Sequence, residues 1–254
     1  MKKTIHIITI ISLITLFFSS CEYDNYDAPS ITFSGQLLDS DGQKFLYDGN
    51  SNKPILNLIQ KGYGKIDGGT TVQVNEQGAF SQLLFEGEYW LTLKNNQYPF
   101  EFKDFKSLGV GLGYDSIHIN VSGSINRNFE VTPYYLISDY TLKEDNGEIV
   151  ANFKVSKNPK ITADIPKVVR ARLFVGTASI VNSATTCTKS KIVSITSEGS
   201  VEVRVSIASG DNSYRKIYVN NYRDYAFCRV GVEVNGIADY YLFSETKKIE
   251  NLTQ

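Results

Sequence analysis

The chain is 254 residues long, and its 26 lysines and arginines nearly balance its 27 aspartates and glutamates, for a formal net charge of −1. No basic stripe runs along the sequence, which argues against binding of nucleic acid and against electrostatic attachment to anionic lipid. The part that follows the N-terminal segment is long enough for one large or two small domains, each with its own core.

The first twenty residues have the composition of an export signal. Two lysines near the start provide a positive segment, and residues 4–18 form an apolar run. A membrane-spanning helix needs about twenty apolar residues, so this run is typical of a signal peptide instead. Two serines then lead to Cys21, which predicts a lipoprotein signal peptide over residues 1–20, cleavage before Cys21 and lipidation of its thiol. The alternatives are an ordinary secretory signal with an accidental cysteine, and a short uncleaved anchor.

Residues 21–29 read as a tether. Residues 22–27 are rich in acidic side chains, which keep the segment solvated, and Pro29 stands at the start of the expected fold. Two or three acyl chains on Cys21 make a stable membrane anchor, whereas a single chain is marginal. An acidic stretch directly after a lipidated cysteine resembles the signal for surface display in Bacteroidota-type bacteria. We therefore expect a lipid-anchored outer-membrane protein that faces the cell surface.

From residue 30 onward short strands alternate with turns, and no stretch keeps a helical period for three turns. This pattern predicts an all-β protein. The first domain is expected over residues 30–132. Its expected strands are 31–38, 56–60, 70–74, 79–85, 89–93, 98–102, 117–121 and 129–131.

Pro133 marks the expected domain boundary, because proline cannot continue a central strand. The pattern restarts after it and predicts a second domain over residues 133–254. Its expected strands are 140–142, 149–155, 168–175, 191–195, 201–207, 217–219, 226–234 and 240–243. A series of short strands with such turns is typical of an immunoglobulin-like or fibronectin-type sandwich.

A family resemblance is carried by three segments of the first domain, 31–39 (ITFSGQLLD), 75–80 (NEQGAF) and 85–91 (FEGEYWL). They resemble a carboxypeptidase-regulatory-like, or transthyretin-like, domain, in which the chain runs G-x-V-x-D, then D-G-x-F, then a G-x-Y-x-L strand. Gln77 stands where that family commonly has aspartate. The resemblance implies hairpin turns at the glycines and a core filled by Phe80, Tyr89 and Leu91. In the second domain, residues 227–232 (FCRVGV) are similar to the penultimate strand of fibronectin-type folds.

The signal peptide and the two halves together resemble a two-domain lipoprotein family of Bacteroidota whose function is unknown. Members of that family are typically associated with glycan-uptake systems built from a TonB-dependent transporter and its lipoprotein partner. The resemblance implies two tandem β-sandwich domains, transthyretin-like and then immunoglobulin/fibronectin-like. It also implies a non-enzymatic surface lipoprotein, accessory to such a transporter, that binds a polysaccharide, an oligosaccharide or a partner protein.

Two other functions are alternatives: a structural or adhesive surface protein, and a degradative enzyme. After signal cleavage one histidine remains, His118, on the strand face opposite Ile117 and Ile119, where a surface histidine would lie. The sequence contains no Gly-x-Ser-x-Gly elbow, no His-Glu-x-x-His and no phosphate-binding glycine loop. A glycosidase needs only two suitably spaced carboxylates, which a sequence alone does not reveal. We expect no catalytic residues and no cofactor.

Metal binding is also not expected. Asp39, Asp41 and Asp48 are the acids that could suggest a calcium site, but they do not follow the ligand ladder of a calcium loop. Turn acids without that ladder are usually solvated.

Trp90 is the candidate ligand-binding residue. If Tyr89, Leu91 and Leu93 form the inner face of their strand, Trp90 points outward beside Thr92. An exposed indole stacks on a sugar ring or anchors a protein interface. The alternative is that a loop or the second domain covers it. Other aromatic residues are expected mostly in the core and at corners of the second domain, namely Tyr222, Tyr225, Tyr240 and Tyr241.

Two cysteines remain once Cys21 is lipidated. An oxidising compartment permits a disulfide between Cys187 and Cys228. Two free thiols, with Cys228 buried, are the alternative, because the sequence does not supply the Cα separation that a disulfide requires.

Overall fold

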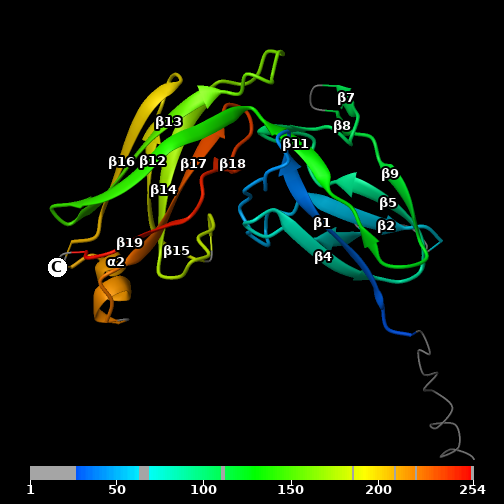
Figure 1. The fold of residues 1–254 in the computed structure, drawn as a ribbon, viewed down its shortest axis with the longest axis horizontal. Coiled ribbons are helices and arrows are strands. Elements are labelled where there is room, and N and C mark those ends of the chain that lie inside the picture. The colour runs from blue at the N-terminus through cyan, green and yellow to red at the C-terminus, as the bar shows by residue number, and fades with distance from the viewer. Residues whose placement is uncertain are drawn as a thin grey trace, which may run out of the picture. The chain divides into compact units, whose positions relative to one another are not determined.

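The structure is a computed structural model that describes residues 27–62, 69–109, 112–184, 186–208, 210–220 and 222–252. Strands dominate these residues, and the helical part is one three-residue α turn and one five-residue π turn. The prediction of an all-β chain with two β-sandwich domains is confirmed (Figure 1). Among the described residues, no helix is long and apolar enough to cross a membrane.

The first domain packs two sheets against each other. One sheet contains β1 (Ile31–Asp39), β4 (Ala79–Leu84), β6 (Phe100–Phe102), β10 (Ile125–Asn126) and β11 (Phe129–Pro133). The other contains, in spatial order, β3 (Thr70–Val72), β2 (Leu56–Gln60), β5 (Gly87–Leu93) and β9 (Ile117–Val121). A small ribbon of β7 (Ser107–Gly109) and β8 (Gly113–Tyr114) lies in a segment that the sequence left without a pattern.

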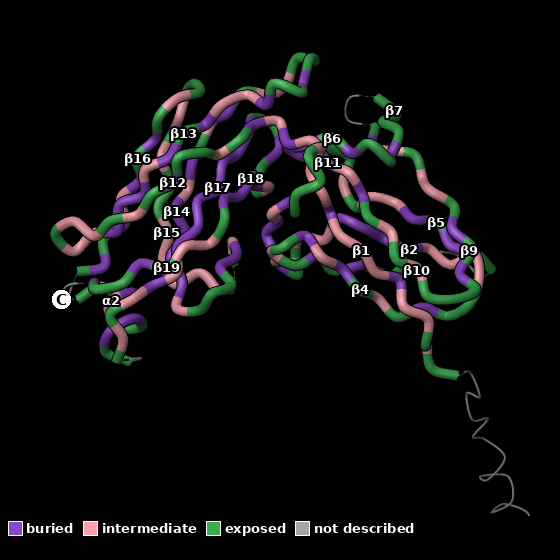
Figure 2. The backbone as a smooth tube through the Cα atoms, viewed as in Figure 1, coloured by how far each residue is buried: buried purple, intermediate pink, exposed green. Residues whose placement is uncertain are grey.

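The core of the first domain follows the period-two alternation of its strands. Tyr89 and Leu91 are buried, as are Phe33 and Phe129 on the facing sheet, and Phe80 stacks near Phe129 with ring centroids 5.8 Å apart. In Figure 2 the buried stretches fall mainly on the strands and the connecting loops are largely exposed. The core residues implied by the family resemblance are therefore in place.

Gly35 shows why the first of the family motifs contains glycine. The N-terminal half of β1 pairs in parallel with β10, and its C-terminal half pairs with β11. Between β10 and β11 the pairing is interrupted at Arg127 and Asn128. A Cβ at Gly35 would stand 1.8 Å from the carbonyl oxygen of Arg127 and 2.6 Å from the ring of Phe80. Only a residue without a side chain allows the backbone to approach this closely.

The second domain also contains two sheets. One consists of β12 (Tyr135–Asp145), β13 (Glu148–Lys157) and β16 (Gly199–Ser206). The other contains β15 (Cys187–Ser194), β14 (Val168–Gly176) and β17 (Ala226–Val234), with β18 (Tyr241–Phe243) and β19 (Lys247–Ile249) both paired to β17. The helical turns α2 (Asn212–Tyr214) and η1 (Arg215–Val219) connect β16 to β17, where the sequence predicted a strand over 217–219.

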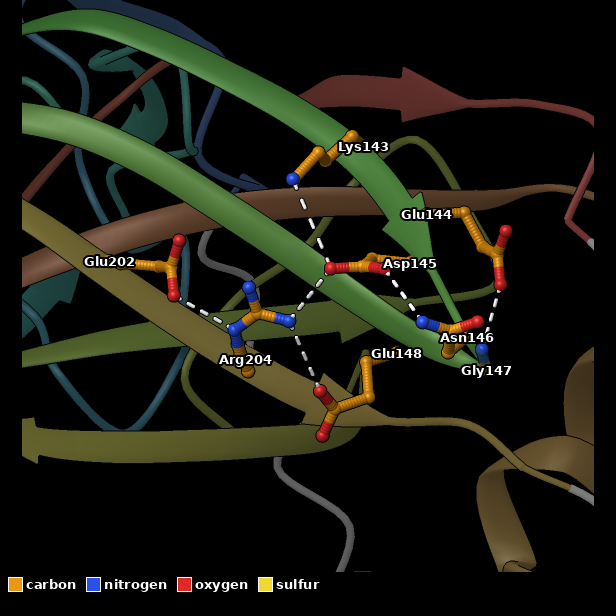
Figure 3. Close-up of polar contacts among 8 residues, drawn as sticks. All are labelled: Lys143, Glu144, Asp145, Asn146, Gly147, Glu148, Glu202 and Arg204. Carbon is orange, nitrogen blue, oxygen red and sulfur yellow. Dashed lines mark hydrogen bonds and ion pairs between the residues drawn. The ribbon is translucent and has the colours of Figure 1, made fainter.

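A charged cluster around Arg204 braces the hairpin of β12 and β13 against β16 (Figure 3). Asn146 and Gly147 form the tip of the β12–β13 hairpin with φ values of 53° and 77°, as an Asn-Gly hairpin turn requires. The Arg204 guanidinium lies 2.8 Å from Glu202, 3.0 Å from Asp145 and 3.4 Å from Glu148. The hydrogen bonds that Arg204 donates to these carboxylates, first of all to Glu202, raise the pKa of Arg204. The cluster therefore links β12, β13 and β16.

The two domains contact each other within one compact unit, residues 31–254. The buried Asp48 carboxylate accepts hydrogen bonds of 2.7 Å from the Ser183 amide and 2.5 Å from the Ser183 hydroxyl. The rings of Tyr98 and Tyr240 pack edge to face with centroids 5.5 Å apart, and Asn95 donates to the Tyr240 hydroxyl. A polar pair and an aromatic pair therefore hold the joint.

The prediction of a disulfide between Cys187 and Cys228 is wrong, because both thiols are free. Cys187 pairs with Gly176 on one side of β14, and Cys228 pairs with Val175 on the other side. Two strand spacings separate their Cα atoms by about 10 Å, whereas a disulfide requires less than about 7 Å. Cys228 is fully buried, and burial raises the pKa of its thiol.

Candidate functional site

The outer face of the sheet β3-β2-β5-β9 carries an apolar row centred on Trp90. The register places Ile59 of β2 and His118 of β9 directly beside Trp90 of β5. Their neighbours Leu58, Leu91 and Ile117 in the next row point to the opposite side, into the core. The indole is 40 % exposed, as the outward orientation predicted, and does not have the full cover that a loop or the second domain would give.

The Trp90 ring is supported from one side by the imidazole of His118. Their ring centroids are 4.9 Å apart with an interplanar angle of 51°. The Nε2 atom of His118 lies 3.8 Å from a carboxylate oxygen of Glu88, which in turn bonds the Lys61 ammonium at 2.6 Å. The hydrogen bond from Lys61, and secondly its charge, lower the pKa of the exposed Glu88 carboxyl. The apolar row is thus bordered by a pair of opposite charges.

On the other border of the row lies Asn57, which shares the outer face with Ile59 two residues later. The Asn57 side chain is buried, yet its amide oxygen has no hydrogen-bond partner in the part of the chain that the structure describes. On the neighbouring strand, the hydroxyl of Thr92 donates to the backbone carbonyl oxygen of Asn57 at 3.4 Å. Gly69 makes close packing possible, since a Cβ there would stand 2.8 Å from the Asn57 amide nitrogen.

This arrangement suits binding of a ligand. A partly exposed indole offers a flat apolar surface, and flanking amide, hydroxyl and charged groups offer hydrogen bonds at its edges. Within the described ranges, no three His, Cys, Asp or Glu side chains gather closely enough to hold a metal ion. His118 has an aromatic ring and one carboxylate as its neighbours, and it lies on the surface strand as the sequence predicted.

Sequence reasoning found Trp90 and His118 separately but did not bring them together. Alternation within a strand placed each side chain on an outer face. Their contact, and the positions of Ile59 and Asn57, depend on the register between strands. The alternation within one strand selects the face of each side chain, but it does not say which residue of a distant strand lies opposite.

The three turn aspartates have partners within the protein. Asp39 accepts hydrogen bonds from the amides of Asp41 and Gln43 in its own turn, at 2.9 and 2.8 Å. Asp41 pairs with Lys160 at 2.5 Å, and Asp48 binds Ser183. The three carboxylates therefore point to different partners and do not converge.

The other predicted positions have mixed outcomes. Cys21 lies outside the described residues, and its lipidation stays a prediction. Tyr241 is buried, but Tyr222 is 94 % exposed, so its expected place in the core or at a corner is wrong. Tyr222 has a φ of 49° and lies in the connection between η1 and β17.

Comparison with known families identifies both domains. Residues 31–132 match the model described as the N-terminal domain of a protein of unknown function, DUF3823. Residues 135–248 match the domain of unknown function DUF3823_C. The two matches meet close to Pro133, where the sequence pattern restarts. No match was found among the curated proteins.

Solved structures give the same picture of the fold. A DUF3823 family protein from Parabacteroides merdae is 27 % identical, with a TM-score of 0.66 over 88 % of this chain and 100 % of that one. A DUF3823 family protein from Bacteroides ovatus is 22 % identical, with a TM-score of 0.60 over 87 % and 99 % of the two chains. A "putative carbohydrate binding protein" from Bacteroides uniformis is 15 % identical, with a TM-score of 0.61 over 88 % and 100 %. At identities below 25 %, the likeness concerns the fold alone.

Proposed function

The chain belongs to the DUF3823 family, and from that premise we propose that it is a non-enzymatic, lipid-anchored surface protein that binds glycan on the Trp90 face. In this proposal it is accessory to a glycan-uptake system built around a TonB-dependent transporter and its lipoprotein partner. One relative of the same fold is named for carbohydrate binding, which is compatible with this assignment.

The single observation that carries the proposal is the outward-facing Trp90 in its row across the sheet. Aromatic rings bury the apolar face of a flat ligand at little cost in conformational entropy. Pyranose rings present such a face, with hydroxyls around the rim that match edge groups such as Lys61, Glu88 and Thr92. The buried amide oxygen of Asn57, which has no hydrogen-bond partner among the described residues, costs about 1–3 kcal/mol of stability. Such unsatisfied polar groups are expected at functional sites, where function outweighs stability.

The experiment uses protein comprising residues 22–254 and a panel of polysaccharides. Trp90 is the only tryptophan, so its fluorescence reports the proposed site directly. We expect at least one polysaccharide both to change the emission and to retard the protein in a glycan-loaded native gel. Retardation without an emission change would place the glycan elsewhere. The absence of both effects across the panel would contradict the proposal.

The anchoring part of the proposal has its own test. Replacing Cys21 by alanine removes the thiol that would carry the lipid, so we expect the variant to leave the membrane fraction. Replacing Ser20 by alanine, a small residue beside the same cleavage point, is the matched control and should leave the protein in the membrane. Membrane retention of the Cys21→Ala variant would contradict lipid anchoring.

A further inference from the structure

A concave site separate from the Trp90 face lies where loops of both domains meet. Its volume is about 390 Å³, within the range of about 300–1,000 Å³ that is typical of small-molecule sites. The first domain contributes the segment after β5 and the β7–β8 ribbon, and the second contributes the segment before β14 and the loop after β17. Pockets of bound small molecules occur preferentially at such domain junctions.

Two tyrosines give this cavity its chemical character. Tyr114 and Tyr134 line it, and neither hydroxyl makes a hydrogen bond to another group among the described residues. Burial, and then the neighbouring Tyr114 and Glu101, raise the pKa of Tyr134 to about 12. Burial and Glu101 also raise the pKa of Tyr114. Both hydroxyls therefore stay protonated at neutral pH and can donate as well as accept hydrogen bonds.

The walls of the cavity are held in position by the surrounding structure. The Tyr134 amide donates to the Pro99 carbonyl at 3.0 Å, and the Tyr134 carbonyl accepts from Asn158 at 2.9 Å. The Tyr135 hydroxyl bonds the carbonyl of Pro166, a lining residue, at 3.1 Å. A site built this way is largely preformed, so a ligand loses less free energy in ordering it.

The charge of the lining selects among ligands. Among the described residues that line the cavity, Asp164 is the one that carries a charge, and the other polar side chains are hydroxyls and amides, including Gln97 and Ser107. Glu101 adds a second negative charge near both tyrosines. The two carboxylates would repel an anionic ligand, whereas the hydroxyl groups of a neutral ligand can form hydrogen bonds with the donors and acceptors of the lining.

From this cavity we propose that the protein has a second carbohydrate subsite, which takes a neutral sugar unit between Tyr114 and Tyr134 and rejects acidic sugars. The inference rests on the proposed glycan-binding function and adds the site and the charge class of the ligand. The two tyrosine rings supply apolar walls, their hydroxyls and the amide side chains bind sugar hydroxyls, and Asp164 disfavours carboxylated or sulfated units.

The test uses residues 22–254, which contain the compact unit 31–254. Native gels are loaded with neutral galactomannan, xyloglucan or starch, and with acidic polygalacturonate or alginate. The proposal predicts retardation by at least one neutral glycan and by neither acidic one. The double variant Tyr114→Phe/Tyr134→Phe should bind the retarding glycan more weakly by about fivefold for each hydroxyl lost.

The outcomes separate this inference from the proposed function. If Trp90→Ala abolishes binding while the double tyrosine variant stays within about twofold of the original protein, the second subsite is overturned and the Trp90 face stands. If no glycan retards the original protein, both proposals fall. Retardation by the acidic glycans alone overturns the ligand class.

The role of Asp164 has a matched pair of variants. Asp164→Asn removes the charge from the lining, and we expect polygalacturonate to gain measurable retardation. Asp224→Asn changes an exposed aspartate that does not line the cavity, and it should leave the gels unchanged. If Asp164→Asn leaves the exclusion of acidic glycans unchanged, the charge argument is overturned.

Discussion

Gly35 demonstrates at the scale of one residue how the sequence specifies the first domain. We predict that Gly35→Ala destabilises the protein by about 1–3 kcal/mol or more, because overpacking forces the neighbouring backbone to move. The Cβ would stand 1.8 Å from the Arg127 carbonyl oxygen, which belongs to the backbone and cannot rotate away. Urea unfolding of residues 22–254 measures this loss.

The control for this substitution is Gly123→Ala. A Cβ at Gly123 has no neighbour within 4 Å, so its effect should stay within about 0.5 kcal/mol. Equal losses for the two alanine variants would show that the close approach at Gly35 is not what requires glycine there.

Single residues also show which side-chain positions could be predicted from the sequence. The inward positions of Tyr89 and Leu91 and the outward position of Trp90 followed from alternation alone. Tyr222 was misjudged because aromatic residues are usually buried, and nothing local distinguishes an exposed one. Local pattern therefore predicts which way a side chain faces on a strand, but says little about residues in irregular connections.

At the scale of elements, Asp211 links two segments that contact each other only in the folded state. It caps α2 by accepting from the Ser213 amide at 2.7 Å, and it pairs with Lys189 of β15. The hydrogen bond from Lys189 lowers the pKa of the Asp211 carboxyl. A lowered folded-state pKa stabilises the protein above the unfolded value of about 3.9, and this contribution disappears as the pH falls through the folded value.

We therefore predict that Asp211→Asn flattens the loss of stability on acidification. Asparagine keeps the capping oxygen, so the change removes mainly the charge. Thermal unfolding of both proteins at neutral pH and below about pH 4 provides the comparison. An equal acid-induced loss in the two proteins would show that the Asp211–Lys189 pair does not contribute.

Elements were easier to predict than their pairing. Strand β2 has the bounds that the sequence indicated, whereas β15 begins at Cys187, before the expected start at residue 191. The row of Ile59, Trp90 and His118 joins three strands, and the sequence of each strand does not specify their order in the sheet. The same information was lacking for Cys187 and Cys228, which β14 holds apart.

At the scale of the whole molecule, the joint between the domains should make the protein unfold as one unit. Asp48 is buried where it binds the half-buried Ser183, so Asp48→Ala removes two hydrogen bonds to a carboxylate, at a cost of about 1–3 kcal/mol. We predict one calorimetric transition for residues 22–254 and a lower, broader or divided one for Asp48→Ala. Two resolved transitions before any substitution would contradict a joint that couples the domains.

The central claim, that the Trp90 face binds glycan, is tested most directly by gel retardation of two aromatic variants on a polysaccharide that retards the original protein. Trp90→Ala removes the proposed platform, and Tyr222→Ala removes a more exposed ring that lies elsewhere. We predict that Trp90→Ala weakens binding more than about tenfold, while Tyr222→Ala is retarded as before. Undiminished retardation of Trp90→Ala would contradict the claim.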